Sequence, residues 1–251
     1  MPWFRRKHHA FDEPFPEEWR AVIAANLSHW KYLDADDREH LEDTVLWLVF
    51  EKRWEAARGF ELTYDIQVTI AAHAALLVLG FDVDDYASVD TIIVHSSTIV
   101  LRDTQSGLFV NDGPQHLLGL AQYRGPVIIA WDEALANARH PERGHNVIYH
   151  EFAHKLDMLD GTIDGTPPLE TQQALDRWNE VFSHELDELR ASRAEGLLSP
   201  YGATNNAEFF AVVTEVFFDQ GAELAQSSPA LYDVLREFYR QDPARRTPLT
   251  E

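Results

Sequence analysis

Residues 148–157 read IYHEFAHKLD and place His150 and His154 four positions apart, with Glu151 between them. Apolar residues flank the trio, which predicts a buried helix over residues 145–158. Residues i and i+4 of a helix share one face, with Cβ atoms roughly 5–6 Å apart, so both imidazoles can reach one metal ion. Glu151 lies about 100° round the helix from His150, where it would contact a water molecule on the metal rather than the metal itself.

This HExxH pattern supplies two ligands and a general base in zinc peptidases. With 12 His in 251 residues, chance alone gives about 0.05 matches per chain, so the pattern needs support from its context. The alternative is that both histidines are ordinary core residues on an amphipathic helix. Burying three polar side chains among apolar neighbours costs free energy unless a partner such as a metal satisfies them, and this favours the metal site.

A catalytic zinc site needs a third protein ligand beyond two histidines. Glu208 is the candidate, because it lies at the start of the apolar helix expected over residues 207–218. An ordinary first-turn glutamate, favoured by the helix dipole, is the alternative. Glu215 lies two turns further along the same face, where it suits a hydrogen-bond acceptor for a ligand imidazole, although a solvated glutamate fits equally well.

Three more residues are candidates from their position. Asp157 and Asp160 follow the two histidines and could hydrogen-bond to the ligands, but capping of the helix end is the competing explanation and the favoured one for Asp160. Tyr201 stands seven residues before Glu208 in a loop that contains Pro and Gly. Its phenol could donate to a developing oxyanion opposite the metal, whereas packing of its ring on the sheet is the alternative.

Composition restricts the ligands and partners. The formal net charge is −21, which argues against direct nucleic-acid or membrane binding, because both rely on Lys and Arg facing phosphate. Cysteine is absent, so a metal site must use His and carboxylate groups, and a cytoplasmic location is expected. Residues 1–19 have no apolar segment of the secretory type, and the longest apolar run, residues 66–81, is too short to span a bilayer comfortably. We expect a soluble protein.

The pattern along the chain predicts an α+β fold. Besides the helix that carries HExxH, helical spacing and caps indicate helices over residues 17–26, 34–54, 64–79, 171–194, 207–218 and 229–241, with Gly80 as the C-cap of the third. The β-branched runs 90–101 and 125–131 predict strands. We expect a mainly helical N-terminal lobe over residues 1–85. A catalytic lobe over residues 86–251, with a small sheet and the HExxH helix, would form one compact unit with it.

Two segments together resemble the Mlc titration factor A family of bacterial zinc metallopeptidases: HEFAHKLD at 150–157 and YGATNNAEFFAVVTEVFF at 201–218. The resemblance extends over most of the chain through GFELT at 59–63, GPVIIAW at 125–131 and FYRQDP at 238–243. Members of this family are gluzincins, whose catalytic core is similar to that of anthrax lethal factor. The resemblance therefore implies a zincin-like fold.

The resemblance also implies roles for five residues. His150, His154 and Glu208 would bind one Zn²⁺ per chain, Glu151 would be the general base, and Tyr201 the active-site tyrosine. The implied activity is hydrolysis of peptide bonds by a metal-activated water, with an aminopeptidase-like preference as one option. The implied partners are a peptide or protein substrate and an Mlc-like, glucose-responsive transcription repressor.

Other interpretations stay open. A regulatory binding protein would sequester an Mlc-like repressor with little peptidase activity, and a charge of −21 suits a basic protein partner. A purely structural zinc site would have four protein ligands, whereas the sequence offers three. Asn205 and Asn206 stand where the family often has an acidic or polar residue followed by Pro, which affects only the cap of the helix with Glu208. PVIIAW at 126–131 is a candidate edge strand for an extended peptide.

Overall fold

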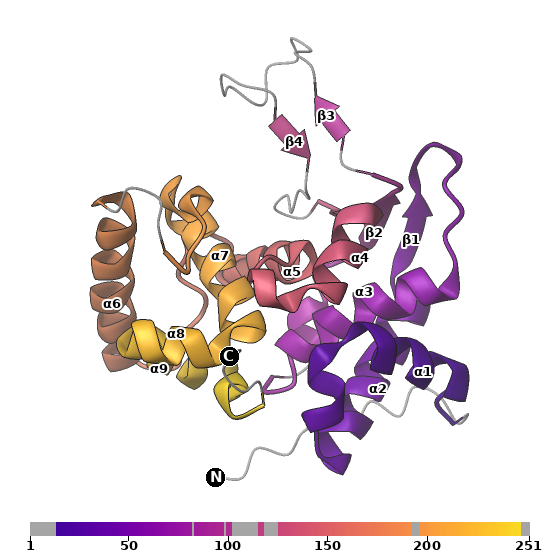
Figure 1. The fold of residues 1–251 in the computed structure, drawn as a ribbon, viewed down its shortest axis with the longest axis horizontal. Coiled ribbons are helices and arrows are strands. Elements are labelled where there is room, and N and C mark those ends of the chain that lie inside the picture. Colours follow the sequence, from indigo (N-terminus) through magenta and orange to yellow (C-terminus); the bar gives the residue numbers. More distant parts are fainter. Residues whose placement is uncertain are drawn as a thin grey trace.

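The computed structural model describes residues 14–81, 83–97, 99–101, 115–117, 125–191 and 196–246. The α-helices are α1 Glu17–Asn26, α2 Ala35–Glu51, α3 Tyr64–Leu77, α4 Trp131–Arg139, α5 Val147–Asp157, α6 Gln172–Ala191, α7 Asn206–Asp219, α8 Gly221–Ser227 and α9 Pro229–Tyr239. The strands are β1 Arg53–Ala56, β2 Thr91–His95, β3 Ile99–Leu101, β4 Gln115–Leu117 and β5 Val127–Ala130. The predicted α+β class is confirmed, with many helices and a small sheet beside them (Figure 1).

Three short parallel strands form the main sheet, in the order β1-β2-β5. The register places Ile92 of β2 opposite Trp54 of β1 and Val127 of β5. Within the described ranges β5 pairs only with β2, so it forms an edge of this sheet. Strands β3 and β4 form a separate antiparallel pair, which projects beyond the helical body at the top of Figure 1.

The strand boundaries correct the sequence analysis in three places. The β-branched run predicts one strand over residues 90–101, whereas β2 ends at His95 and β3 belongs to the second sheet. The strand predicted over residues 125–131 is β5, but Trp131 already begins α4. The helix predicted over residues 34–54 ends at Glu51, because the chain that follows pairs with β2 as β1.

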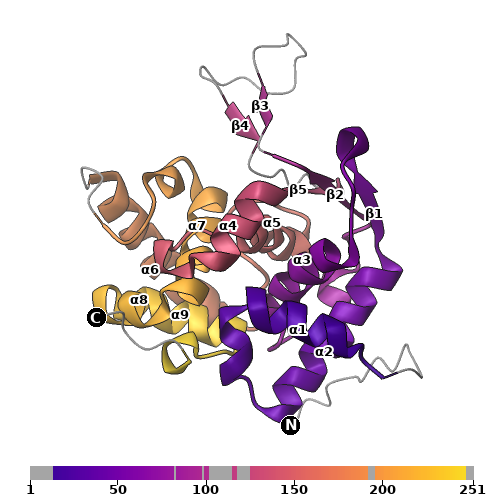
Figure 2. The same cartoon turned by 45° about the vertical axis from the view of Figure 1, so that its right-hand side comes forward.

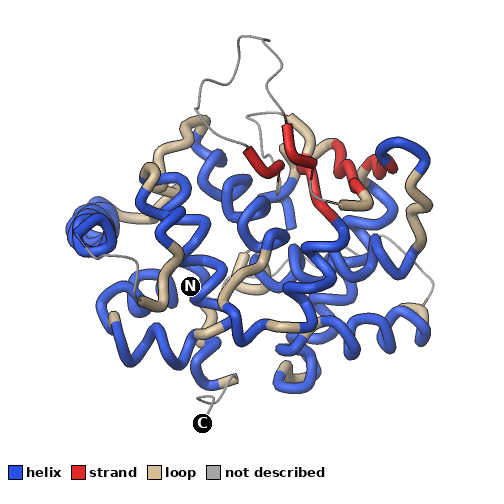
Figure 3. Tube along the Cα trace, turned by 45° about the horizontal axis from the view of Figure 1, so that its top comes forward, coloured by secondary structure: helices blue, strands red, loops and turns tan. Residues whose placement is uncertain are grey.

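Helix α5 is central to the fold, and it packs against α3, α7 and β5 (Figure 2). Helices α1 and α2 pack on α3, whereas α6 and α8 pack on α9. Viewed from above, the strands gather on one side of the helices (Figure 3). Buried apolar side chains from the N-terminal and C-terminal parts form one continuous hydrophobic core. The helices that carry the predicted site are therefore held by packing on several sides, while the division into two lobes at residue 85 stays a prediction.

Helix α3 shows how the sequence sets a fully buried element. Thr63 caps it by accepting a hydrogen bond from the Ile66 N–H at 3.4 Å, and nearly every later residue is buried. The helix ends at Leu77, so the prediction that Gly80 is its C-cap is wrong. A Cβ at Gly80 would overlap the carbonyl oxygen of Tyr239, so the glycine allows close approach to the end of α9. No helix within the described ranges is both long and apolar enough to cross a bilayer.

Candidate metal centre

Helix α5 brings the two predicted histidine ligands together. Its N-cap, Asn146, accepts a hydrogen bond from the Tyr149 N–H at 3.3 Å, which fixes where the helix begins. His150 and His154 then lie on one face, with their Nε2 atoms 3.3 Å apart. Their rings are nearly perpendicular, at 84°, and approach each other through these two nitrogens. The spacing read from the sequence is realised as a pair of converging imidazoles.

Helix α7 supplies the carboxylate. Asn205 caps it by accepting a hydrogen bond from the Glu208 N–H at 2.9 Å, which fixes where the helix begins. The Glu208 Oε2 atom lies 3.0 Å from Nε2 of His150 and 3.6 Å from Nε2 of His154. Because α5 and α7 pack directly against each other, a residue 58 positions from His150 reaches the same point.

These three side chains have the geometry of a metal-binding site. Their donor atoms all lie within 4.8 Å of one another, and no other such group of three occurs in the described parts of the chain. Two zinc–ligand bonds of about 2.05 Å at a tetrahedral angle would separate their donor atoms by roughly 3.3 Å. The observed separations of 3.0, 3.3 and 3.6 Å bracket that value. Two imidazoles and one carboxylate are also a donor set that suits Zn²⁺.

Glu215 orients one of the ligands. Its Oε1 atom accepts a hydrogen bond from Nδ1 of His150 at 2.7 Å, and its Oε2 atom accepts one from the Asn146 N–H at 2.7 Å. The first bond places a proton on Nδ1 and leaves Nε2 of His150 to face the metal position. The Glu215 side chain is only 7% exposed, so it is held in place rather than solvated.

The second histidine has no such partner. His154 is buried, and its Nδ1 atom has no hydrogen-bond partner in the described structure. Burial lowers the pKa of His154, which keeps the imidazole neutral and suited to donate a lone pair. The two imidazoles thus differ: Glu215 fixes the tautomer of His150, whereas burial sets the charge state of His154.

The charges around the site are strongly coupled when no metal is bound. Burial lowers the pKa of His150, but hydrogen bonds to Glu208 and Glu215 outweigh it and raise that pKa well above its ordinary value. Burial raises the pKa of Glu208, but hydrogen bonds from His150 and His154 outweigh it and lower that pKa. A positive charge is therefore stabilised at the point where the three donors meet.

Glu151 is buried beside the ligands but is not one of them. The side chain has 2% relative exposure, and its Oε2 atom has no hydrogen-bond partner among the described residues. Burial is the main reason why the pKa of Glu151 rises to about 8. A cation held by the neighbouring ligands would lower it again, since opposite charge favours the ionised form. A buried carboxylate with an unused oxygen suits the predicted role of general base.

Tyr201 stands on the short 3₁₀ helix that precedes α7. Its ring centroid lies 5.9 Å from that of His150, and the residue is 54% exposed. The ring therefore lies at the rim of the site. Packing of the ring on the sheet is the alternative that the sequence left open. Partial burial and the Glu208 carboxylate raise the pKa of the Tyr201 phenol, which keeps its O–H available as a donor.

The two aspartates after the HExxH residues serve the loop. Asp160 accepts hydrogen bonds from the N–H and hydroxyl of Thr162 at 2.9 and 2.7 Å, as the capping interpretation predicts. Asp157 is buried, and its Oδ2 atom accepts a hydrogen bond from the Gly165 N–H at 3.0 Å. This hydrogen bond joins Asp157 to the loop and not to a ligand histidine.

Sequence reasoning missed two buried polar residues beside the site. Asn146 caps α5, and its N–H donates a hydrogen bond to Glu215. An asparagine directly before an apolar helix is the sequence pattern that could have indicated this cap. Lys155 follows His154 immediately, and its Nζ atom donates to the carbonyl oxygen of Gly125 at 2.9 Å. A lysine inside an apolar stretch could have indicated a buried cation, but no sequence pattern indicates its hydrogen-bond acceptor.

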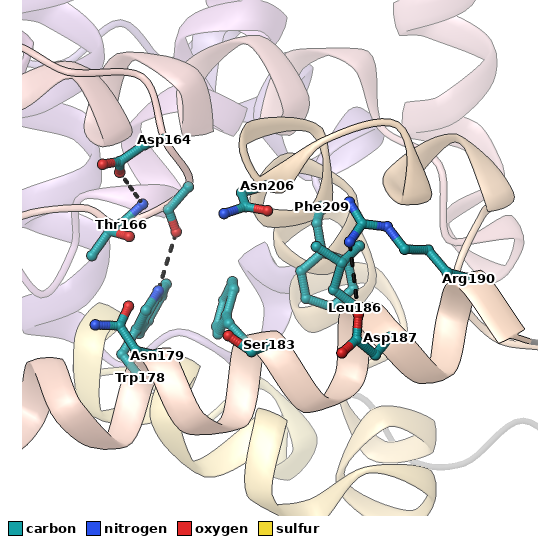
Figure 4. Close-up of a pocket in the computed structure, with 12 residues that line it drawn as sticks. Asp164, Thr166, Trp178, Asn179, Ser183, Leu186, Asp187, Arg190, Asn206 and Phe209 are labelled. Atoms are coloured by element: carbon teal, nitrogen blue, oxygen red, sulfur yellow. Dashed lines mark hydrogen bonds and ion pairs between the residues drawn. The ribbon is translucent and has the colours of Figure 1, made fainter.

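A pocket of about 250 Å³ lies between α6, the loop around Gly165 and the start of α7 (Figure 4). The stacked rings of Trp178 and Phe182 line it, and Asn206 lies at its upper edge in that view. None of the predicted site residues lines it. Asn206 and Glu208 are two residues apart on a helix and so project about 200° apart, which places the pocket on the other side of α7 from the metal centre.

Comparisons with known proteins cover nearly the whole chain. Residues 1–240 match the family model described as Glucose-regulated metallo-peptidase M90. An uncharacterized protein of Synechocystis sp. is 35% identical over 95% of this chain and 89% of its own length. Proteins named Mlc titration factor A, from Serratia proteamaculans and Yersinia pestis, are 28% and 30% identical. They align over 98% and 91% of this chain and over 94% and 86% of their own lengths.

Proposed function

This chain belongs to the glucose-regulated metallopeptidase M90 family, and from that membership we propose that it hydrolyses peptide bonds at the site of His150, His154 and Glu208. The resemblance to the Mlc titration factor A family is confirmed by the relatives of that name. The observation that carries the proposal is the convergence of three donor atoms within 4.8 Å. We assign the metal as one Zn²⁺ per chain, because two imidazoles and one carboxylate suit it.

Zinc bound there would lower the pKa of a water molecule from 15.7 toward about 7 and polarise the scissile carbonyl group. Glu151 takes the proton from the attacking water and then passes it to the leaving amine. Its unpartnered Oε2 atom supports this assignment, since the oxygen is free to accept that proton. Its position on α5, round the helix from both histidines, keeps it close to the ligands without binding the metal.

Tyr201 stabilises the oxyanion that forms from the substrate carbonyl. Its ring lies beside that of His150, and its half-exposed position at the rim lets a substrate reach the phenol. A phenol that keeps its proton donates to developing negative charge, and such donors contribute strongly to acyl-transfer catalysis.

An extended substrate would bind along β5. This strand is an edge of the parallel sheet in the described structure, and it packs on the helix that carries HExxH. A peptide that pairs with a free edge gains backbone hydrogen bonds whatever its sequence. Neither the residue preference nor the choice between internal cleavage and aminopeptidase-like cleavage follows from this edge.

The test compares three forms of the full chain, purified without added metal or chelator. Zinc per chain and cleavage of peptide and aminoacyl reporters are measured for the wild type, Glu151→Gln and Glu208→Ala. We expect about one zinc in the wild type and in Glu151→Gln, with hydrolysis at least about 10²-fold slower in the latter. Glu208→Ala should lose most of the metal. Full activity of Glu151→Gln would contradict the mechanism.

A second function is supported by the printed name of the relatives and by charge. Mlc titration factor A is a name that refers to a partner, and this chain carries a net charge of −21, which suits a basic protein surface. We propose an Mlc-like repressor as that partner and the cytoplasm as the place of the encounter. If His150→Ala still binds the repressor, this function is independent of the metal site. If the variant loses both the metal and the repressor, the two functions depend on each other.

A further inference from the structure

Lys155 is a buried cation that the mechanism above does not use. It lies on α5 directly after His154, and its side chain is only 1% exposed. Its Nζ atom donates a hydrogen bond to the carbonyl oxygen of Gly125 at 2.9 Å. Burying an ammonium group is costly unless it is paired and hydrogen-bonded, and an apolar side chain would fill the same space without that cost. Lysine is therefore present here although an apolar residue would cost less free energy to bury.

The carbonyl that accepts the hydrogen bond from Lys155 lies two residues before the edge strand β5. Gly125 is followed by Pro126 and then by β5, which starts at Val127. Proline has no N–H to donate to a strand ladder, so residue 126 can contribute at most its carbonyl oxygen to the sheet. In the described chain β5 pairs on one side only, with β2. The lysine thus supplies a fixed point at the start of β5 that lies outside the ladder of the sheet.

The same face of α5 carries the anchor and the proposed base. Glu151 and Lys155 are four residues apart, so they lie one above the other on the helix surface. Both side chains are buried, and α5 packs directly against β5 (Figure 2). The contact of Lys155 that fixes β5 therefore lies one turn along α5 from Glu151.

We propose that Lys155 is a positioning residue, which holds the start of β5 on α5 so that a peptide paired along the edge of β5 opposite β2 presents its scissile carbonyl to Glu151. This inference rests on the proposed function for its consequence in catalysis. The anchor itself is a property of the fold and can be tested without any substrate.

Lys155→Met is the test variant, because methionine keeps an unbranched stem and removes the donor. Lys52→Met is the matched control, since Nζ of Lys52 also donates to a backbone carbonyl, that of Tyr86 at 2.8 Å, but away from β5. Lys155→Gln serves as a second variant if methionine prevents folding, because its shorter side chain keeps an amide donor that cannot span the same distance. All are studied as zinc-loaded full chains.

The first readout is amide hydrogen exchange followed by mass spectrometry. We expect exchange over residues 127–130 to become at least about fivefold faster in Lys155→Met, while exchange over residues 91–95 stays within about twofold. Lys52→Met should leave residues 127–130 unchanged. Equal exchange of β5 in the wild type and Lys155→Met would overturn the anchor, whether or not the chain is a peptidase.

The second readout is kcat/KM for two reporters, one of about eight residues that can pair with β5 and one aminoacyl reporter that cannot. We expect Lys155→Met to lose about tenfold on the long reporter and less than about twofold on the short one, with the zinc content unchanged. Equal losses on both reporters would overturn the positioning role. A wild type that cleaves neither reporter would instead count against the proposed function, and hydrogen exchange would still decide the anchor.

Discussion

Nδ1 of His150 donates a 2.7 Å hydrogen bond to Oε1 of Glu215, which joins helix α5 to helix α7. The other nitrogen of the same ring, Nε2, lies 3.0 Å from Oε2 of Glu208. One imidazole is therefore held between two carboxylates of a single helix, one on each side of the ring. The two glutamates are seven residues apart, which is close to two helical turns, so both carboxylates lie on the same face of α7.

Removal of the Glu215 carboxylate should weaken metal binding without removing a ligand. We expect Glu215→Ala to bind Zn²⁺ about 10- to 100-fold more weakly than the wild type, because Nδ1 of His150 loses the acceptor that fixes its tautomer. Competition with a chelator of known affinity measures this directly. Glu215→Gln keeps an acceptor oxygen, so its zinc affinity should lie between those of the wild type and Glu215→Ala.

Ser199→Ala is a control near the metal centre for the Glu215 series. Ser199 caps the 3₁₀ helix that carries Tyr201, and in the described structure its Oγ atom accepts a hydrogen bond from the Tyr201 N–H rather than contacting a ligand. Its zinc affinity should stay within about threefold of the wild type. Zinc affinity of Glu215→Ala equal to that of the control would show that the hydrogen bond to His150 does not contribute to metal binding.

Tyr201→Phe should slow the chemical step and leave the metal in place. The phenol is a donor at the rim, next to His150, and the substitution removes only its O–H. We expect kcat to fall about 10- to 100-fold with KM changed less than about threefold, which is the pattern for a group that acts mainly in the transition state. Steady-state kinetics with zinc analysis of the same preparation checks it, and a change in KM alone would assign Tyr201 to substrate binding.

The helices of the site could be predicted because their signals are local. HExxH has helical spacing within an apolar run, and the segment after Asn205 has both a cap and continuous apolar character. Strand β1 was missed because RWEA has one aromatic residue and no β-branched residue, and it follows α2 with almost no break. Its strand character comes from pairing with β2, which lies far along the chain.

The contacts of the site were less predictable than its residues. The spacing of His150 and His154 fixes their relation on one helix, but Glu215 is 65 positions away from His150. Only the packing of α5 on α7 brings the two together. The bond from Lys155 to Gly125 has the same origin, because it depends on where β5 lies against α5. Sequence patterns therefore indicated which side chains have chemistry, and packing determined what each one meets.

Asn205 should contribute to stability and to the position of Glu208. Its side chain accepts a hydrogen bond from the Glu208 N–H at 2.9 Å, so the cap and the ligand share one peptide unit. We expect Asn205→Ala to lower the free energy of unfolding by about 1 kcal/mol, and Asn205→Asp to keep it within about 0.5 kcal/mol. Urea denaturation of both variants measures this. Equal losses in both would mean that the cap hydrogen bond does not contribute.

Asp157 should make stability depend on pH. Burial raises the pKa of this carboxyl from 3.8 to about 6, although a hydrogen bond from the Gly165 N–H opposes the rise. Between these values the folded chain binds more protons at Asp157 than the unfolded chain does, so this residue makes stability fall as pH rises through the window. The loss is complete above about pH 6 and amounts to about 3 kcal/mol.

Asp157→Asn removes that titration and keeps an oxygen for the Gly165 N–H. The amide leaves other costs, such as unpaired N–H groups, but they are the same at every pH. The free energy of unfolding of the variant minus that of the wild type should therefore be about 2 kcal/mol larger at pH 8 than at pH 4.5, so the variant gains relative stability at high pH. Denaturation at both pH values, with a chelator present to remove the pH dependence of zinc binding, measures the difference. A relative stability that does not change with pH would mean that Asp157 titrates alike in the folded and unfolded chains.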